Sequence, residues 1–327
     1  MIISRTPFRI SFFGGGTDYP VWFREHGGSV ISTAIDKYCY ISCRNLPPFF
    51  EYKHRIVYSK IEHAAKINDI THPSVRECLR FSNPDSGVEI HHDADLPARS
   101  GLGSSSSFTV GLLNVLNAYQ GKITSRRKLF EDAIYVEQKM IGEAVGSQDQ
   151  VIAAVGGFNR IDFQQNGGVD LTPLTADYEV REALQSNIML FFTGLTRTAS
   201  NIAKKQIGLT PERQQELREL HSMVDEAIKI LSSGSKGIQD FGRLLHESWQ
   251  IKRSIHKQVS NSIVDDIYNT ALKAGAVGGK LLGAGGGGFM IIFADPEHQA
   301  EVRKKLSRFM LVPVKFSDQG SQIIFYQ

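Results

Sequence analysis

The chain has 327 residues, of which 41% are hydrophobic, and a formal net charge of +3; this length predicts two domains with a large buried core. The small, dispersed charge argues against nucleic-acid binding. Three cysteines without a Cys-x-x-Cys pair, no signal peptide and no apolar run of the ~20 residues that a membrane span needs predict a cytoplasmic protein that binds no membrane.

The first half of the chain mixes strand and helix patterns. A first helix is predicted to begin in the serine run at 104–107 and to end at Gly121, and a second to run from Thr124 to about residue 141. A polar hairpin turn is predicted at 164–168. The predicted strands cover residues 2–13, 30–44, 55–59, 88–91 and 159–163.

The second half is mostly helical. A buried strand is predicted at 188–192. The pair Thr210-Pro211 predicts a helix start, because threonine caps helices and proline fits their first turn. Helical patterns then fill about 211–275, and the chain closes with a strand, a helix and a strand. A polar segment at 177–186 separates the two halves.

The segment from Pro97 to Ser107, Pro-Ala-Arg-Ser-Gly-Leu-Gly-Ser-Ser-Ser-Ser, joins a strand pattern to a helix pattern. Unpaired backbone N–H groups and the positive end of the helix dipole bind phosphate at such a loop. The common P-loop is excluded, because the only Gly-Gly-Lys, at 278–280, is followed by Leu281 rather than Ser or Thr. A Gly/Ser loop also serves as a linker, so this segment alone leaves both readings open.

Two further segments accompany this loop. Residues 5–20 read as a strand that runs into a glycine turn and then an acid, and residues 278–289 form a second glycine-rich loop before a strand. Together the three segments resemble the three motifs of the GHMP kinases: galactokinase, homoserine kinase, mevalonate kinase and phosphomevalonate kinase. The resemblance implies an α+β protein of two domains, ribosomal S5 domain 2-like at 1–185 and ferredoxin-like at 186–327, with ATP between them.

Phosphoryl transfer needs a phosphate cradle, a magnesium ion, activation of the acceptor hydroxyl and positive charge on the transferring group. Ser105 matches the serine that binds Mg²⁺ in this family, and Glu137 matches its magnesium carboxylate; a helix cap and a solvated glutamate are the structural alternatives. If the match to the family is shifted along the chain, Glu143 is the magnesium carboxylate instead of Glu137. The resemblance implies that the ATP phosphates contact Gly101, Leu102, Gly103, Ser104, Ser105 and Ser106.

The acceptor hydroxyl is expected to face Asp149, in a Gly146-Ser-Gln-Asp segment that resembles the aspartate segment of the family. An ionised carboxylate at hydrogen-bond distance orients that hydroxyl and accepts its proton; positioning without proton transfer is the alternative. Arg9 aligns with the basic residue of the first motif and would hold Asp149 ionised. A surface arginine at the end of a strand is the alternative for Arg9.

The acceptor itself is expected to contact the first and third motifs. Asp18 lies where sugar-kinase relatives bind a substrate hydroxyl, with Gly15, Gly16 and Thr17 beside it. Gly15 and Gly16 replace the Glu-His pair of galactokinases, so galactose is disfavoured and a bulkier or more polar acceptor is favoured. From the third motif, the predicted contacts are Gly285 and Gly286.

Four segments, 14–20, 72–77, 91–101 and 192–200, resemble bacterial D-glycero-D-manno-heptose 7-phosphate kinases. Those enzymes phosphorylate the anomeric hydroxyl to give the 1,7-bisphosphate, on the route to GDP-heptose for capsule, S-layer or lipopolysaccharide glycans. Arg197 is the predicted ligand of the acceptor's own phosphate; contact with the nucleotide or a surface place is the alternative. We expect ATP and a phosphorylated sugar as ligands, Mg²⁺ as cofactor, and a monomer or homodimer. L-fucose kinase, mevalonate kinase and a non-catalytic ATP- or sugar-binding regulator are the competing functions.

Overall fold

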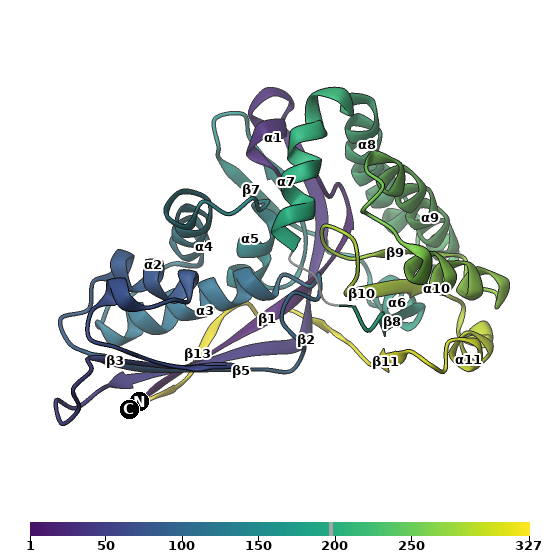
Figure 1. Cartoon of the computed structure of the whole chain (residues 1–327). Coiled ribbons are helices and arrows are strands. Elements are labelled where there is room, and N and C mark those ends of the chain that lie inside the picture. The colour runs from purple at the N-terminus through teal and green to yellow at the C-terminus, as the bar shows by residue number, and fades with distance from the viewer. Residues whose placement is uncertain (196–198) are drawn as a thin grey trace.

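The computed structural model describes residues 1–195 and 199–327, which form two β-sheets with helices packed on them (Figure 1). This mixture of separate helices and largely antiparallel strands confirms the predicted α+β class. The larger sheet runs in the order β13-β1-β2-β5-β3-β4, and β6, β7 and β12 extend it through β2. Its strands are β1 (Ile2–Phe13), β2 (Gly28–Asn45), β3 (His54–Val57), β4 (Ile61–Ala64), β5 (Val88–Ala94), β6 (Phe158–Phe163), β7 (Val169–Pro173), β12 (Phe316–Ser317) and β13 (Gln322–Tyr326).

Helix α3 (Ser104–Tyr119) lies across β1 and β2 and is buried over most of its surface. The approach is close enough to require a glycine, because a Cβ on Gly111 would lie 2.7 Å from Thr6 Oγ1. Ser4 Oγ also donates to the Gly111 carbonyl oxygen at 2.9 Å. The middle of α3 is therefore held against β1. The neighbouring helices are α1 (Pro20–His26), η1 (Ile67–Asp69), α2 (Pro73–Ser82), α4 (Arg126–Tyr135), the π-helical turn η2 (Val136–Ile141) and α5 (Gln148–Val155).

The smaller sheet is antiparallel in the order β11-β8-β10-β9, and both of its faces are covered. Along β10, Phe289, Ile291 and Phe293 belong to the larger core, whereas Met290 and Ile292 between them belong to a second core. Its strands are β8 (Ile188–Phe192), β9 (Gly278–Leu281), β10 (Phe289–Phe293) and β11 (Met310–Val312). The helices of this half are α6 (Tyr178–Ser186), α7 (Ala199–Leu209), η3 (Thr210–Glu212), α8 (Gln214–Ser232), η4 (Ser235–Gly237), α9 (Ile238–Ile255), α10 (Ser262–Lys273) and α11 (Pro296–Lys305).

The predicted strands and helices are found close to their expected bounds, with one clear exception. The helix start predicted at Thr210 is only partly confirmed: the short 3₁₀ helix η3 begins there with Pro211 in its first turn, but helix α8 begins at Gln214. Thr210 Oγ1 donates to the Gln206 carbonyl oxygen at 3.4 Å, so this hydroxyl belongs to the end of α7 and does not cap the next helix. Threonine makes either contact, and the sequence pattern does not distinguish them.

The chain returns to the first sheet at its end. Strand β12 pairs with β2 and β13 pairs with β1, and the two termini lie next to each other in Figure 1. Residues of the second predicted domain thus complete the first sheet, and the domain division at residue 185 stays a prediction. None of the helices that the structure describes has both the length and the apolar character needed to span a bilayer.

Candidate active site

A cavity of about 990 Å³ is lined by residues from both halves of the chain. All three predicted motifs reach it: Arg9 from β1, Gly103 from the loop before α3, and Gly283 from the loop between β9 and β10. Helices α7, α8 and α9 contribute the opposite part of the wall through residues such as Gln206 and Lys252. The tertiary fold therefore brings segments from the beginning, middle and end of the sequence to one site.

The loop before α3 presents its backbone to the cavity. Gly101 and Gly103 have φ values of 84° and 76°, which favour glycine. A Cβ on Gly101 would lie 2.5 Å from the Leu282 carbonyl oxygen, so this loop also packs against the third motif. Leu102 is fully buried and contributes its carbonyl oxygen, which accepts from the Arg9 amide at 3.0 Å. The predicted cradle residues that line the cavity are Gly101, Gly103, Ser104, Ser105 and Ser106.

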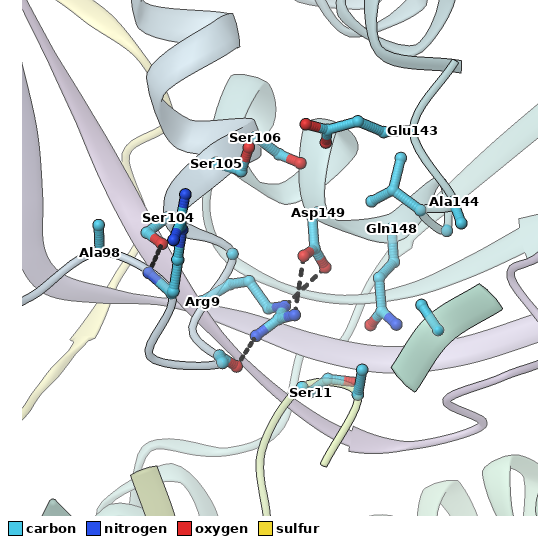
Figure 2. Close-up of a pocket in the computed structure, with 18 of the residues that line it drawn as sticks. Arg9, Ser11, Ala98, Ser104, Ser105, Ser106, Glu143, Ala144, Gln148 and Asp149 are labelled. Carbon is cyan, nitrogen blue, oxygen red and sulfur yellow. Dashed lines mark hydrogen bonds and ion pairs between the residues drawn. The ribbon is translucent and has the colours of Figure 1, made fainter. Parts of the chain in front are cut away.

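Arg9 and Asp149 form a two-pronged ion pair beside this loop (Figure 2). Arg9 Nε donates to Asp149 Oδ1 at 2.7 Å, and Nη2 donates to Oδ2 at 2.8 Å. Its third nitrogen, Nη1, donates to the Gly101 carbonyl oxygen at 2.7 Å. Arg9 is 5% exposed, which excludes the alternative of a surface arginine, and burial strengthens a charge-assisted pair of this kind.

Glu137 lies in the π-helical turn η2 and has no exposed surface. Its Oε2 accepts hydrogen bonds from Ser106 Oγ at 2.9 Å and from Gln150 Nε2. Burial raises the pKa of this carboxyl to about 8. Its Oε1 is buried and has no hydrogen-bond partner among the described residues. Ser105, predicted to act with Glu137, is exposed on the cavity wall instead, and Ser106 is the serine that contacts Glu137.

The donor set around Glu137 fits a magnesium ion. Hydroxyl and carboxylate oxygens are its preferred ligands, and the unpartnered Glu137 Oε1 is an atom that a cation would satisfy. An ion held by Glu137 would lie next to Ser106, whereas an ion held by Ser105 would lie on the cavity wall, where it would neutralise charge on the ATP phosphates. Glu143, the alternative carboxylate, lines the cavity near Ser105 and Asp149 (Figure 2), whereas Glu137 does not line it. The choice between the two glutamates stays a prediction.

Asp18 is 3% exposed and lies on the cavity wall next to the start of α5. Its Oδ1 accepts from the Gly16 amide at 3.0 Å, and its Oδ2 accepts from Gln148 Nε2 at 3.0 Å. Burial, and then the nearby charge of Asp149, raise the pKa of the Asp18 carboxyl. Gly15 and Gly16 line the cavity as well. The structure thus gathers most of the predicted acceptor residues of the first motif.

Thr17 is the exception in this motif. It is fully buried and is not part of the cavity wall. Its hydroxyl donates to the carbonyl oxygens of Gly14 at 2.8 Å and Ser29 at 3.0 Å. Thr17 therefore holds the glycine turn against β2, and its side chain does not face the cavity in which the acceptor is expected.

Replacing Gly146 with alanine is expected to disable the acceptor side of the cavity. A Cβ at this position would lie 1.9 Å from Asp18 Oδ2, so Asp18 has to move. We expect KM for the sugar to rise by about tenfold or more while KM for ATP stays the same, because a small displacement of a positioning group is costly. Steady-state kinetics with each substrate varied measures this. Gly208→Ala, where nothing lies within 4 Å, is the control; an unchanged sugar KM in Gly146→Ala contradicts the placement of Asp18.

The third motif reaches the cavity with different residues than predicted. Gly283 and Ala284 line the cavity, and Gly285 and Gly286 do not. The reason is that the second part of this loop packs against residue 259: a Cβ on Gly285 would lie 2.7 Å from Val259 Cα, and the Gly286 amide donates to the Val259 carbonyl oxygen at 2.9 Å. The predicted phosphate ligand Arg197 lies outside the described residues.

The sequence did not point to two lysines on the cavity wall, of which Lys280 is 3% exposed and Lys252 is half-buried. Lys252 Nζ, from α9, donates to the carbonyl oxygens of Leu281 and Gly283, and burial lowers its pKa to about 8. Lys280 Nζ donates to the Phe12 carbonyl oxygen at 2.6 Å, and burial lowers its pKa well below the ordinary value. Lys280 belongs to the Gly-Gly-Lys at 278–280, which does not match a P-loop but could have marked this lysine as a candidate site residue. No sequence pattern marked Lys252, because a single lysine in a helical pattern normally lies in water.

Another part of the wall is aromatic. The ring of Phe108 stacks on His72 with centroids 5.0 Å apart and meets the edge of His92 at 4.9 Å. Tyr58 meets His72 edge-on at 4.9 Å. Burial lowers the pKa of both histidines, which favours uncharged rings. An aromatic wall of this kind suits a planar ligand group such as a nucleobase.

Comparison with protein families agrees with this geometry. The GHMP kinases N terminal domain matches residues 67–157, and the GHMP kinases C terminal domain matches residues 233–311, which together exceed half of the chain. The chain belongs to the GHMP kinases. The predicted two-domain GHMP kinase fold and the predicted ATP-dependent sugar kinase activity are thereby confirmed.

Individual relatives are similar to this GHMP kinase over nearly its whole length. The D-glycero-alpha-D-manno-heptose 7-phosphate kinase of Campylobacter jejuni is 29% identical over 94% of this chain and 93% of its own. The L-fucokinase/L-fucose-1-P guanylyltransferase of Bacteroides fragilis is 25% identical over 99% of this chain, which spans 38% of that longer protein. A solved D-glycero-D-manno-heptose 1-phosphate kinase from Bacteroides thetaiotaomicron has a TM-score of 0.81 at 22% identity, with both chains fully covered, and shows the shared fold.

Proposed function

We propose that this kinase transfers the γ-phosphoryl group of ATP to the anomeric C1 hydroxyl of D-glycero-D-manno-heptose 7-phosphate. The product is the 1,7-bisphosphate, a step toward GDP-heptose for surface glycans. The observation that carries the proposal is the match to the Campylobacter jejuni heptose 7-phosphate kinase over 94% of this chain. The acid-lined acceptor side around Asp18 and Asp149 supports it, because carboxylates accept hydrogen bonds from sugar hydroxyls.

In this proposal the triphosphate lies along the backbone of the loop from Gly101 to Ser106, at the N-terminus of α3. Helix α3 is long and buried, so its first N–H groups are fixed in direction and stabilise phosphate charge. The base lies against the aromatic wall formed by Phe108 and His72. This order leaves the γ-phosphate next to Asp149 and the acceptor side.

Asp149 then orients the C1 hydroxyl and accepts its proton as the new P–O bond forms. The two-pronged contact with Arg9 fixes the orientation of this carboxylate beforehand, since both of its oxygens accept from the guanidinium. Arg9 also contacts the phosphate loop at Gly101. Its positive charge therefore lies between the proposed base and the proposed phosphate site, where negative charge develops during transfer.

The phosphate that the acceptor already carries needs its own cation. Arg197 is the proposed ligand from the sequence, and Arg213 is a second one that the structure supports. Arg213 lines the cavity, and its Nε is buried without a hydrogen-bond partner among the described residues, although Nη1 donates to Glu216 at 2.8 Å. One turn later, Leu217 packs on the first motif, since a Cβ on Gly16 would lie 3.0 Å from its Cδ2. Arg213 therefore belongs to the acceptor side.

Replacing Arg197 with alanine is expected to raise KM for the sugar phosphate by roughly 10–100-fold and to leave KM for ATP nearly unchanged. The factor corresponds to the loss of about 1.5–3 kcal/mol for a charge-assisted contact. Arg213→Gln should act in the same direction. Arg218→Ala, an exposed arginine of α8, is the control. If Arg197→Ala loses affinity for ATP instead, the phosphate assignment is wrong.

The function is tested by coupled ADP release with a panel of acceptors. Heptose 7-phosphate should be the best acceptor, followed by the unphosphorylated heptose, and phosphorus NMR of the product should show a phosphate on C1. A clear preference for L-fucose would overturn the proposal in favour of the fucose-kinase alternative, which the Bacteroides fragilis relative supports. A preference for mevalonate would overturn both.

A further inference from the structure

Two residues combine a place on the cavity wall with a buried side-chain atom that has no hydrogen-bond partner among the described residues: Arg213 and Gln148. Arg213 Nε is a donor, and it already has a place in the proposed function. Gln148 Oε1 is an acceptor, and nothing so far uses it. Gln148 is 7% exposed and begins α5, immediately before Asp149. A buried amide oxygen without a donor is costly, so such atoms usually gain a donor from water or a ligand.

The orientation of the Gln148 amide follows from its contact with Asp18. Nε2 donates to Asp18 Oδ2 at 3.0 Å, and the Gln148 backbone amide donates to the same oxygen at 3.5 Å, so the side-chain nitrogen rather than the side-chain oxygen faces Asp18. Asp18 Oδ1 is held by the Gly16 amide at 3.0 Å. In Figure 2 the Gln148 amide extends beside Asp149 to the level of the Arg9 guanidinium. The acceptor side therefore carries an amide oxygen and a carboxylate next to the proposed base.

We propose that Gln148 Oε1 and the Asp18 carboxylate accept hydrogen bonds from two hydroxyl groups of the acceptor, which makes Gln148 a specificity-determining residue for a polyhydroxylated ring. This deepens the proposed function and rests on it for the placement of the acceptor next to Asp149. The pair offers acceptors, so its ligand must offer donors, and sugar hydroxyls do. An acceptor that carries a carboxylate would set its own negative oxygens against Asp18 and Gln148, and the pair disfavours it.

The inference makes a sharp prediction because sites built around hydrogen bonds to hydroxyls reject analogues that lack them. A deoxy sugar leaves Gln148 Oε1 buried and unpaired, while the parent sugar satisfies it. The hydroxyl that meets Gln148 is therefore identified by one analogue in a series in which each hydroxyl is removed in turn. Replacing Gln148 with methionine keeps the length of the side chain and removes both its donor and its acceptor.

The experiment compares wild type and Gln148→Met on the single-deoxy series of the sugar phosphate. In the wild type, one analogue should lose about 10–100-fold in kcat/KM. In Gln148→Met the parent sugar should lose a similar factor, the same analogue should lose little more, and KM for ATP should not change. Calorimetric titration of the sugars in the absence of ATP should give the same pattern. Gln138→Met is the matched control: Gln138 Nε2 donates to Ser147 Oγ at 3.0 Å, and the residue is not on the cavity wall.

The inference is overturned if the losses in kcat/KM caused by Gln148→Met and by removal of a hydroxyl simply add. In that case the variant discriminates against every deoxy analogue as strongly as the wild type does. A wild type in which no single hydroxyl matters, or one that accepts mevalonate as well as sugars, overturns it too. If Gln148→Met does not fold, Gln148→Asn, whose shorter side chain withdraws the oxygen, gives the same comparison. If the wild type phosphorylates another sugar, the proposed function fails by itself, and the deoxy series of that sugar then decides the role of Gln148.

Discussion

Replacing Asp149 with asparagine is expected to lower kcat by about 100-fold or more while ATP still binds. The substitution keeps the shape of the side chain but removes the charge that accepts the hydroxyl proton. It also breaks the two-pronged ion pair, because an amide nitrogen then faces the Arg9 guanidinium, whose Nε and Nη2 each donate to an Asp149 oxygen. The rate is measured at saturating ATP and sugar, and nucleotide affinity by calorimetric titration.

The control for this variant is Asp225→Asn. Asp225 also pairs with an arginine, Arg160, at 2.6 Å, but it is mostly exposed and lies away from the cavity wall. Exposed pairs contribute little, so kcat should stay within about twofold of the wild type. Near-normal turnover in Asp149→Asn would remove Asp149 from the chemistry. A loss of nucleotide binding would show that Asp149 supports the phosphate loop through Arg9 instead.

Replacing Glu137 with glutamine is expected to raise the magnesium concentration needed for half-maximal activity by roughly tenfold or more, and Ser105→Ala should act in the same direction. Each change deletes an oxygen that would place the ion between the phosphates. The double variant should need the most magnesium. The measurement is the rate as a function of free Mg²⁺ at saturating ATP, together with calorimetric titration of magnesium into the complex with a non-hydrolysable ATP analogue.

Folding of this variant is a useful internal check. Burial raises the pKa of Glu137 to about 8, so without a cation the carboxyl is largely protonated at neutral pH, and glutamine resembles that neutral form. The melting temperature in the absence of magnesium should therefore not fall at pH 7. Glu143→Gln is the matched variant on the cavity wall. If Glu143→Gln changes the magnesium requirement and Glu137→Gln does not, the family's magnesium glutamate was matched to the wrong residue and Glu143 is the ligand.

The proposed phosphate loop could be predicted from the sequence because the residues that it needs are consecutive in the chain. Phosphate binding by backbone N–H groups requires glycines, small hydroxyl residues and a helix start in consecutive positions, and that pattern survives in the one-dimensional sequence. The positive φ values of Gly101 and Gly103 are the structural form of the same requirement. The aspartate and arginine of the other motifs were found for a similar reason, since each stands in a short segment typical of the family.

The acceptor side could be predicted only in part, because it is assembled from separate elements. The sequence pointed to Asp18 but also to Thr17, Gly285 and Gly286, whose contacts stay within the fold. Lys252 and Lys280 were not predicted as cations of the cavity wall, because a residue's place on a cavity wall depends on packing and not on the local sequence.

The sequence by itself determined the family, the α+β class, the glycine-serine loop before α3 and the importance of Arg9 and Asp149, which the structure pairs, because each depends on residue types within short segments. Only the tertiary structure decided which serine meets Glu137, how deeply that carboxyl is buried, and that Gln148 stands against Asp18 with an unpaired oxygen. These facts depend on distances between residues far apart in the chain. Desolvation and hydrogen-bond partners follow from those distances, and no local pattern encodes them.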